Sequence, residues 1–163
     1  MPRSGIRAAV LGLWVGLLAA APVWAQGLKL SGADGQTAIL SPADIAALPH
    51  APLSVTIEGK TTSYDGVPLD VLLQRVGAPA GKALRGAALR DMVLVTGRDG
   101  YAAVFALAET DPGFRKGRIL LADRADGQPL GDTAGPYRLV VEGDLRAARC
   151  VRMVTAIEVR VAR

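Results

Sequence analysis

Cysteine and histidine are nearly absent from this chain of 163 residues, which contains one of each, Cys150 and His50. An intramolecular disulfide needs two cysteines, and the usual zinc sites need three or four histidine or cysteine ligands. A histidine-based catalytic triad would have to use His50, which stands in a proline-rich connection and is interpreted as a solvated loop residue. The sequence therefore argues against disulfide scaffolds, common zinc enzymes and triad hydrolases.

Aromatic residues are also scarce, at 4% of the chain, and the basic residues are scattered. Nucleic-acid-binding proteins combine a basic patch or stripe with aromatic side chains on which bases stack. Glycine-rich phosphate loops of the Walker or dinucleotide type are absent as well. We therefore expect no nucleic-acid partner and no nucleotide bound through such a loop.

The first residues have the pattern of a secretory signal peptide. Arg3 and Arg7 precede a long uncharged run that ends in Val23-Trp24-Ala25, with small residues at the −3 and −1 positions. An uncleaved membrane anchor is the alternative, because the run approaches the length of a spanning helix. We predict a signal peptide over residues 1–25, a single domain over residues 26–163, and a periplasmic or secreted location.

The strongest strand signal lies at Met92–Leu107, where two apolar, β-branched-rich runs flank Gly97-Arg98-Asp99-Gly100. Asp-Gly supplies the positive-φ residue that tight hairpin turns need. We predict a hairpin whose strands are central and whose tip is a surface site.

Other short elements follow from local patterns. Strands are predicted at 28–30, 37–40, 53–59, 119–122, 137–142 and 154–161. Short helices are predicted after Ser41 and after Pro68, and Tyr64–Val67 is predicted to be a turn. Many short strands with one or two short helices indicate an α+β, largely β fold and argue against a Rossmann-type sheet.

Carboxylates are the remaining acid–base candidates. Asp99, Glu109 and Asp111 cluster in sequence around the hairpin. A carboxylate in a cleft can transfer protons, but Asp99 is also explained by turn chemistry alone.

Cys150 stands between two cations, Arg149 and Arg152. Neighbouring positive charge favours a reactive thiolate if the sulfur is exposed. The other interpretation is a small buried hydrophobe, because free cysteine is among the most often buried residue types.

Five segments follow one another along the chain at Tyr64–Leu69, Asp99–Tyr101, Leu120–Ala122, Gly135–Val140 and Val154–Val159. In their order and spacing they resemble the oxidoreductase molybdopterin-binding domain family of sulfite-oxidase type. The resemblance implies a mixed-sheet, barrel-like fold with short helices. It also implies a cleft, shaped by the Gly-Pro-x-Arg segment and the Asp-Gly-Tyr hairpin, that holds molybdopterin in full-length relatives.

One departure from the family decides what we expect of this cleft. Cofactor-bearing relatives place a cysteine thiolate on molybdenum in the stretch corresponding to Val55–Tyr64, which contains no cysteine here. We predict an accessory ligand-binding module with no metal ligand, in which Arg138 pairs with an anion, Tyr101 offers a ring and a hydroxyl, Asp99 lies beside it and Tyr64 lies at the rim. No cofactor is predicted from the residues; the resemblance allows molybdopterin, and the ligand is an anionic small molecule or a pterin.

Two other functions remain open at this point. The chain is a genuine molybdopterin-dependent oxidoreductase if the metal is held through the pterin alone, or if the fold brings Cys150 to it. It is a protein-interaction module if the cleft has no role and a membrane redox or signalling partner binds elsewhere.

Overall fold

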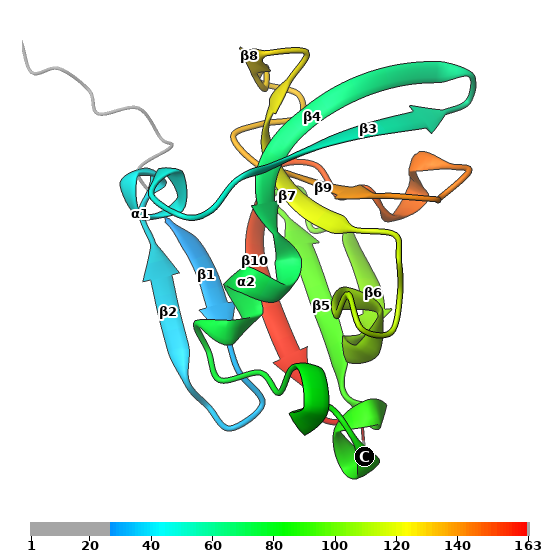
Figure 1. Ribbon diagram of the computed structural model, residues 1–163. Coiled ribbons are helices and arrows are strands. Elements are labelled where there is room, and N and C mark those ends of the chain that lie inside the picture. Colours follow the sequence, from blue (N-terminus) through cyan, green and yellow to red (C-terminus); the bar gives the residue numbers. More distant parts are fainter. Residues whose placement is uncertain (1–26, 163) are drawn as a thin grey trace, which may run out of the picture.

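The structure, a computed structural model, describes residues 27–162, so the predicted signal peptide lies outside the described residues. Two five-stranded sheets form the domain (Figure 1). The first has the strand order β2-β1-β10-β5-β6 and is mixed, because β1 and β10 run parallel. Its strands are β1 (Leu28–Ser31), β2 (Thr37–Leu40), β5 (Met92–Gly97), β6 (Ala102–Ala106) and β10 (Val154–Arg160).

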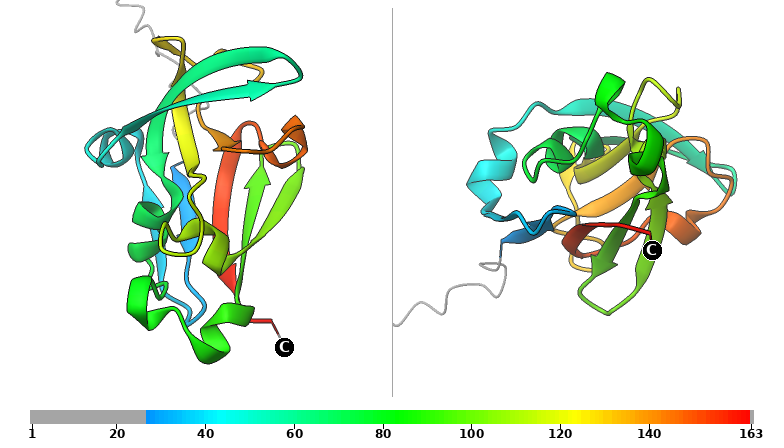
Figure 2. Two further views of the ribbon diagram at one scale, coloured as in Figure 1. Left: turned by 45° about the vertical axis from the view of Figure 1, so that its right-hand side comes forward. Right: turned by 90° about the horizontal axis from the view of Figure 1, so that it is seen from below.

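The second sheet is antiparallel, with the order β3-β4-β7-β8, and β9 also pairs with β7. Its strands are β3 (Ala51–Ile57), β4 (Lys60–Pro68), β7 (Ile119–Ala125), β8 (Gln128–Pro129) and β9 (Arg138–Val141). The β3–β4 hairpin forms a long arm at one end of the molecule, above the segment that joins β9 to β10, as both Figure 1 and Figure 2 show. This arrangement positions the site described below.

The helices are short. They are α1 (Pro42–Ala46), α2 (Leu69–Gln74) and the 3₁₀ turns η2 (Gly81–Ala83), η3 (Gly86–Arg90), η4 (Leu107–Thr110) and η5 (Ala147–Arg149). Ser41 and Asp44 form the predicted capping box of α1: the Asp44 backbone N–H donates to the Ser41 hydroxyl and the Ser41 backbone N–H donates to the Asp44 carboxylate. Within residues 27–162, no helix combines the length and the apolar character needed to cross a bilayer.

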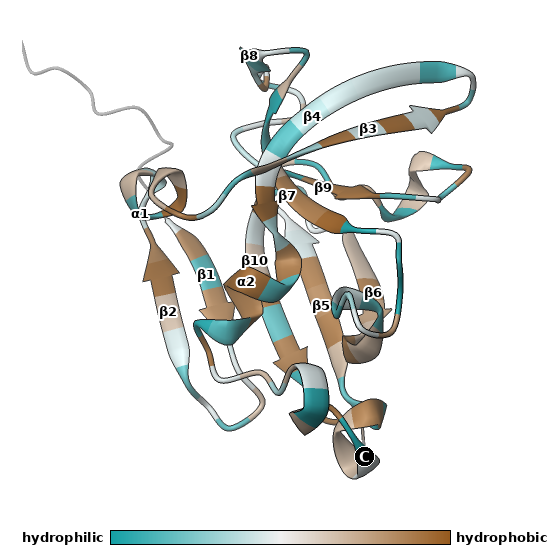
Figure 3. Ribbon diagram, in the orientation of Figure 1, coloured by the Kyte–Doolittle hydropathy of each residue, from teal (hydrophilic) through white to brown (hydrophobic). Residues whose placement is uncertain are grey.

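Apolar side chains form two buried clusters. The larger cluster lies between the first sheet, α2 and one face of the second sheet, and Figure 3 shows the apolar strands that build it. The smaller one lies on the opposite face of β7 and β9, because successive strand residues point to opposite faces. Its members are Leu53, Val55, Tyr64, Leu120, Ala122 and Val140.

The sequence prediction is wrong at Tyr64–Val67, which belongs to β4 and not to a turn. Gly66 is needed there for a close strand contact: a Cβ at this position would lie 2.3 Å from the carbonyl oxygen of Leu121 on β7. The turn lies earlier, at Glu58-Gly59, where both residues have positive φ. The prediction that both hairpin strands are central is also wrong, because β6 is an edge strand.

Candidate functional site

Three backbone hydrogen bonds bring the hairpin tip, β9 and the chain before β10 together. The Arg98 N–H donates to the Met153 carbonyl at 2.9 Å. The Leu139 N–H donates to the Val151 carbonyl at 2.8 Å, and the Val154 N–H donates to the Tyr137 carbonyl at 2.9 Å. Residues beside these bonds therefore face one another although they are far apart in sequence.

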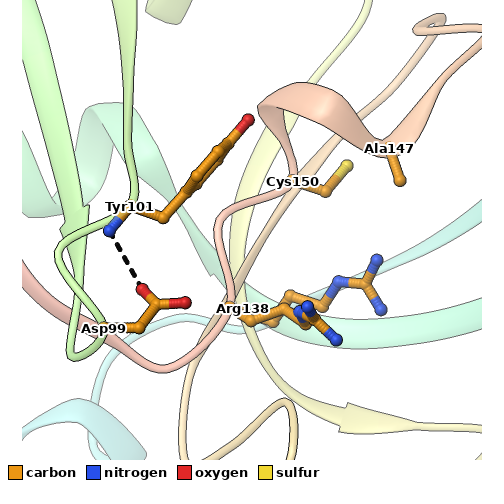
Figure 4. Close-up of a pocket in the computed structure, with 6 residues that line it drawn as sticks. Asp99, Tyr101, Arg138, Ala147 and Cys150 are labelled. Atoms are coloured by element: carbon orange, nitrogen blue, oxygen red, sulfur yellow. Dashed lines mark hydrogen bonds between the residues drawn. The ribbon is translucent and has the colours of Figure 1, made fainter.

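A cavity of about 290 Å³ lies at this junction. Figure 4 shows side chains from the hairpin tip, β9 and the η5 region turned toward it. The cavity is lined by Asp99, Tyr101, Arg138, Ala147, Cys150 and Arg152. Three of the four predicted site residues thus line one cavity, and Tyr64 lies on the other side of Arg138.

Asp99 and Tyr101 are held by the hairpin turn. The Tyr101 backbone N–H donates to Asp99 Oδ1 at 3.0 Å, which is an Asx-type turn interaction. The Tyr101 hydroxyl donates to the Ala148 carbonyl at 2.5 Å, and its side chain is 51% exposed. Tyr101 therefore ties the hairpin tip to the η5 turn while its ring borders the cavity.

Arg138 is held in a partly buried position at the start of β9. Its guanidinium carbon lies 5.7 Å from the centroid of the Tyr64 ring, close enough for a cation–π contact. Its Nε is buried and has no hydrogen-bond partner among residues 27–162. Tyr64 is buried against β3 and β7, and it supports Arg138 from the side away from the hairpin tip.

The cavity is positively charged. Arg152 is exposed, and neither Arg138 nor Arg152 forms an ion pair with any residue that the structure describes. Asp99 is the acidic residue of the lining. Two guanidinium groups against one carboxylate leave a site suited to an anion.

Arg149, the other cation beside Cys150, points away from the cavity. It donates to both carboxylate oxygens of Asp144, at 2.9 and 2.7 Å, and to Glu109 at 3.2 Å. Its guanidinium also lies 5.0 Å from the centroid of the Phe105 ring. The hydrogen bond to Asp144 is the main cause that raises the pKa of Arg149. Arg149 therefore fixes the η5 turn that carries Ala147 and Cys150.

Cys150 is buried, as the second of its two interpretations predicted, yet it lines the cavity. The sequence did not place Arg152 in the site, and it brought Cys150 there only in the alternative of a genuine oxidoreductase. The two cations beside Cys150 were the sequence signal that this segment could belong to a site. Which of the two faces the cavity follows only from the hydrogen bond between Leu139 of β9 and Val151.

Burial raises the pKa of the Cys150 thiol, and this effect exceeds the opposing ones of a hydrogen bond from the Val141 backbone and of the positive charge of Arg138. We expect iodoacetamide to label the folded protein slowly at pH 7, with the rate rising only above the ordinary cysteine range. The folded state therefore binds this proton more tightly than the unfolded state does. The contribution of the buried thiol to the free energy of unfolding is complete at pH values below the pKa of the unfolded state, and it is lost as the pH rises through the pKa of the folded state.

Mass spectrometry of the labelled protein measures this directly, because Cys150 is the only cysteine of the sequence. The same protein in denaturant provides the reference rate of an exposed thiol. Rapid labelling of the folded protein at pH 7 would show that Cys150 is a thiolate and would contradict the assignment.

The other acid–base candidates are occupied by structural contacts. Glu109 accepts hydrogen bonds from Arg149 and from the Ala106 backbone N–H. Asp111 is buried and accepts from the backbone N–H groups of Gly81 and Gly113. Neither lines the cavity. The geometry gives no proton-transfer role to these carboxylates.

His50 is not the solvated loop residue that the sequence predicted. It is partly buried, with Nδ1 2.8 Å from the Leu48 carbonyl and Nε2 3.4 Å from Asp123 Oδ2. Both ring nitrogens thus face partners within the protein. His50 joins the start of β3 to β7 and does not line the cavity at Arg138.

A family model described as "Oxidoreductase molybdopterin binding domain" matches residues 27–163, and the chain belongs to this family. Among solved structures, it is similar to the sulfane dehydrogenase SoxCD from Paracoccus pantotrophus, with a TM-score of 0.68 and 18% identity. The match covers 84% of this chain and 38% of that one, so the chain spans well under half of the SoxCD chain. No curated protein matches the sequence. The predicted family and its mixed-sheet α+β fold are therefore confirmed.

The residues of the cavity do not fit a thiolate-ligated molybdenum centre. Such a metal needs a cysteine thiolate. The β3–β4 hairpin, which contains the stretch Val55–Tyr64, has no cysteine, and Cys150 comes from the segment between β9 and β10.

Proposed function

We propose that this molybdopterin-binding-family domain binds a small organic anion between Arg138 and Arg152 and acts as an exported accessory module, not as a catalyst. The observation that carries the proposal is the pair of guanidinium groups that line one cavity without a carboxylate partner. Each can donate charge-assisted hydrogen bonds to a carboxylate, sulfonate or phosphonate. The exposed ring of Tyr101 borders the same space.

The acidic group of the ligand would lie beside the guanidinium of Arg138. Arg138 Nε has no hydrogen-bond partner among the described residues, and a buried donor left without one costs about 1–3 kcal/mol. An anion reaching this donor would remove that penalty. Asp99 keeps one carboxylate oxygen bound to the Tyr101 N–H, which limits its competition for Arg138.

Calorimetric titration with methylphosphonate tests the proposal. We expect the wild-type protein to bind it and the Arg138→Gln variant to bind about tenfold or more weakly, because a hydrogen bond to a charged group is worth roughly 1.5–3 kcal/mol. Arg85 is an exposed arginine between η2 and η3 that lines neither this cavity nor any adjoining it, so Arg85→Gln is the charge-matched control. Equal affinities of the two variants would refute binding at Arg138.

A molybdopterin-dependent oxidoreductase is the alternative function, and the position of Cys150 favours it. The fold brings this thiol to the cavity wall beside Arg138, as that function requires. The lack of a cysteine in Val55–Tyr64, where cofactor-bearing relatives carry the metal ligand, opposes it. If the alternative holds, Cys150→Ser removes bound metal from the protein purified from its native compartment; in an accessory module the substitution leaves the metal content unchanged.

A further inference from the structure

A second cavity, of about 160 Å³, adjoins the first at Arg138 and Ala147, which line both. It extends along the inner side of the β3–β4 arm. Its other lining residues are Val55, Ile57, Lys60, Thr62 and Tyr64. Arg138 therefore stands between two spaces and can contact a molecule that occupies both.

The two spaces differ in chemistry. The first has two guanidinium groups and the Tyr101 ring, whereas the second has the flank of the smaller core cluster as its floor, with Val55 and Tyr64 buried and Ile57 half-buried. No carboxylate lines the second space, and Lys60 stands at its far end. An apolar or aromatic group bound there would bury hydrocarbon surface, which stabilises the complex. A positively charged group would be repelled by Lys60 and Arg138.

The course of the chain keeps the second space accessible. The β3–β4 arm reaches over the segment between β9 and β10, with η5 on the opposite side (Figures 1 and 2). Ala147 is the η5 residue that faces the arm, and its small side chain leaves room between the two segments. A bulky residue at this position would divide the two spaces.

We propose that the ligand of this site is an elongated amphipathic anion, with its acidic group between Arg138 and Arg152 and an apolar or aromatic body along Val55, Ile57 and Tyr64. This inference rests on the proposed function and goes beyond it by naming the ligand class. It assigns a specificity role to the β3–β4 arm, which contributes none of the cationic residues that hold the acidic group. The arm contacts the body of the ligand and sets the preference for it, whereas Arg138 contacts both the acidic group and the body.

Two probes with the same acidic group, methylphosphonate and phenylphosphonate, separate the inference from the proposed function. We expect the wild-type protein to bind phenylphosphonate at least about tenfold more tightly, because the phenyl ring buries apolar surface in the second space. The Ile57→Ser variant is expected to lose this preference and to keep its affinity for methylphosphonate. Ile39→Ser changes an isoleucine that is 73% exposed on β2, in the other sheet, and is the matched control.

Each outcome has a separate meaning. If neither probe binds the wild-type protein, the proposed function fails and the inference fails with it. If both bind with equal affinity, or if the preference survives Ile57→Ser, anion binding stands and the elongated ligand is refuted. Thr62→Gln fills the same space from β4 and must also abolish the preference, so the test does not depend on the folding of one variant.

Discussion

Replacing Phe105 by alanine is expected to lower the free energy of unfolding by about 4 kcal/mol, the range found for large aromatic residues in cores. Phe105 is only 1% exposed and belongs to the larger core cluster, against which β6 packs. Its ring also lies under the Arg149 guanidinium that fixes the η5 turn. The substitution therefore leaves a cavity in the core and removes the support of one wall of the site.

Urea denaturation of the variant measures this loss, and the rate of iodoacetamide labelling of Cys150 should rise as the η5 turn loosens. Val104 is the adjacent residue on β6 but is 51% exposed, so Val104→Ala should change stability by no more than about 0.5 kcal/mol. If the two variants lost similar amounts of unfolding free energy, the assignment of Phe105 to the buried face of β6 and of Val104 to the exposed face would be wrong.

Replacing Gly66 by alanine should lower the free energy of unfolding by about 3 kcal/mol, at the upper end for overpacking. The added Cβ would lie 2.3 Å from the Leu121 carbonyl oxygen and 2.5 Å from the Ala122 Cα, both of which are backbone atoms. Backbone cannot move aside as a flexible side chain can. β4 and β7 would have to separate at the register shift between Asp65 and Gly66, where Tyr64 supports Arg138.

The matched control is Gly131→Ala, because Gly131 is exposed and an added Cβ meets no atom within 4 Å. Thermal or chemical denaturation should show little change for that variant. If Gly66→Ala were tolerated equally well, Tyr64–Val67 would be an open turn, and the strand assignment would be wrong.

Local sequence patterns predicted the elements that depend on interactions between residues close together in the chain. The capping box at Ser41 and Asp44, the apolar spacing of α2 and the Asp-Gly turn of the β5–β6 hairpin depend on residues within a few positions of one another. The family resemblance implied a mixed-sheet fold and a cleft shared by Tyr101 and Arg138, and the structure places both residues in the lining of one cavity.

Features that depend on distant partners were not predictable in the same way. Gly66 stands in a Tyr-Asp-Gly-Val sequence that is typical of turns. Only the close approach of β7 shows that Gly66 is a strand residue with no room for a side chain. Arg149 and Arg152 both lie within two residues of Cys150, and the sequence does not show which of them lines a site. Pairing of Leu139 with Val151 turns Arg152 to the cavity, while Asp144 holds Arg149 away from it.

The site stands on the scaffold of its family. Tyr101 and Arg138 line one cavity, and the buried thiol of Cys150 reaches it from the segment before β10. Arg138 and Arg152 line the cavity without an ion-pair partner among the described residues, so anion binding is the chemistry that these side chains support best.

The central claim, that the domain keeps the cleft but carries no thiolate-bound metal, is tested most directly by elemental analysis combined with pterin fluorescence on protein purified from its native compartment. We expect molybdenum and tungsten well below one atom per chain, with no matching pterin. Stoichiometric molybdenum or tungsten together with pterin would contradict the claim and establish the oxidoreductase.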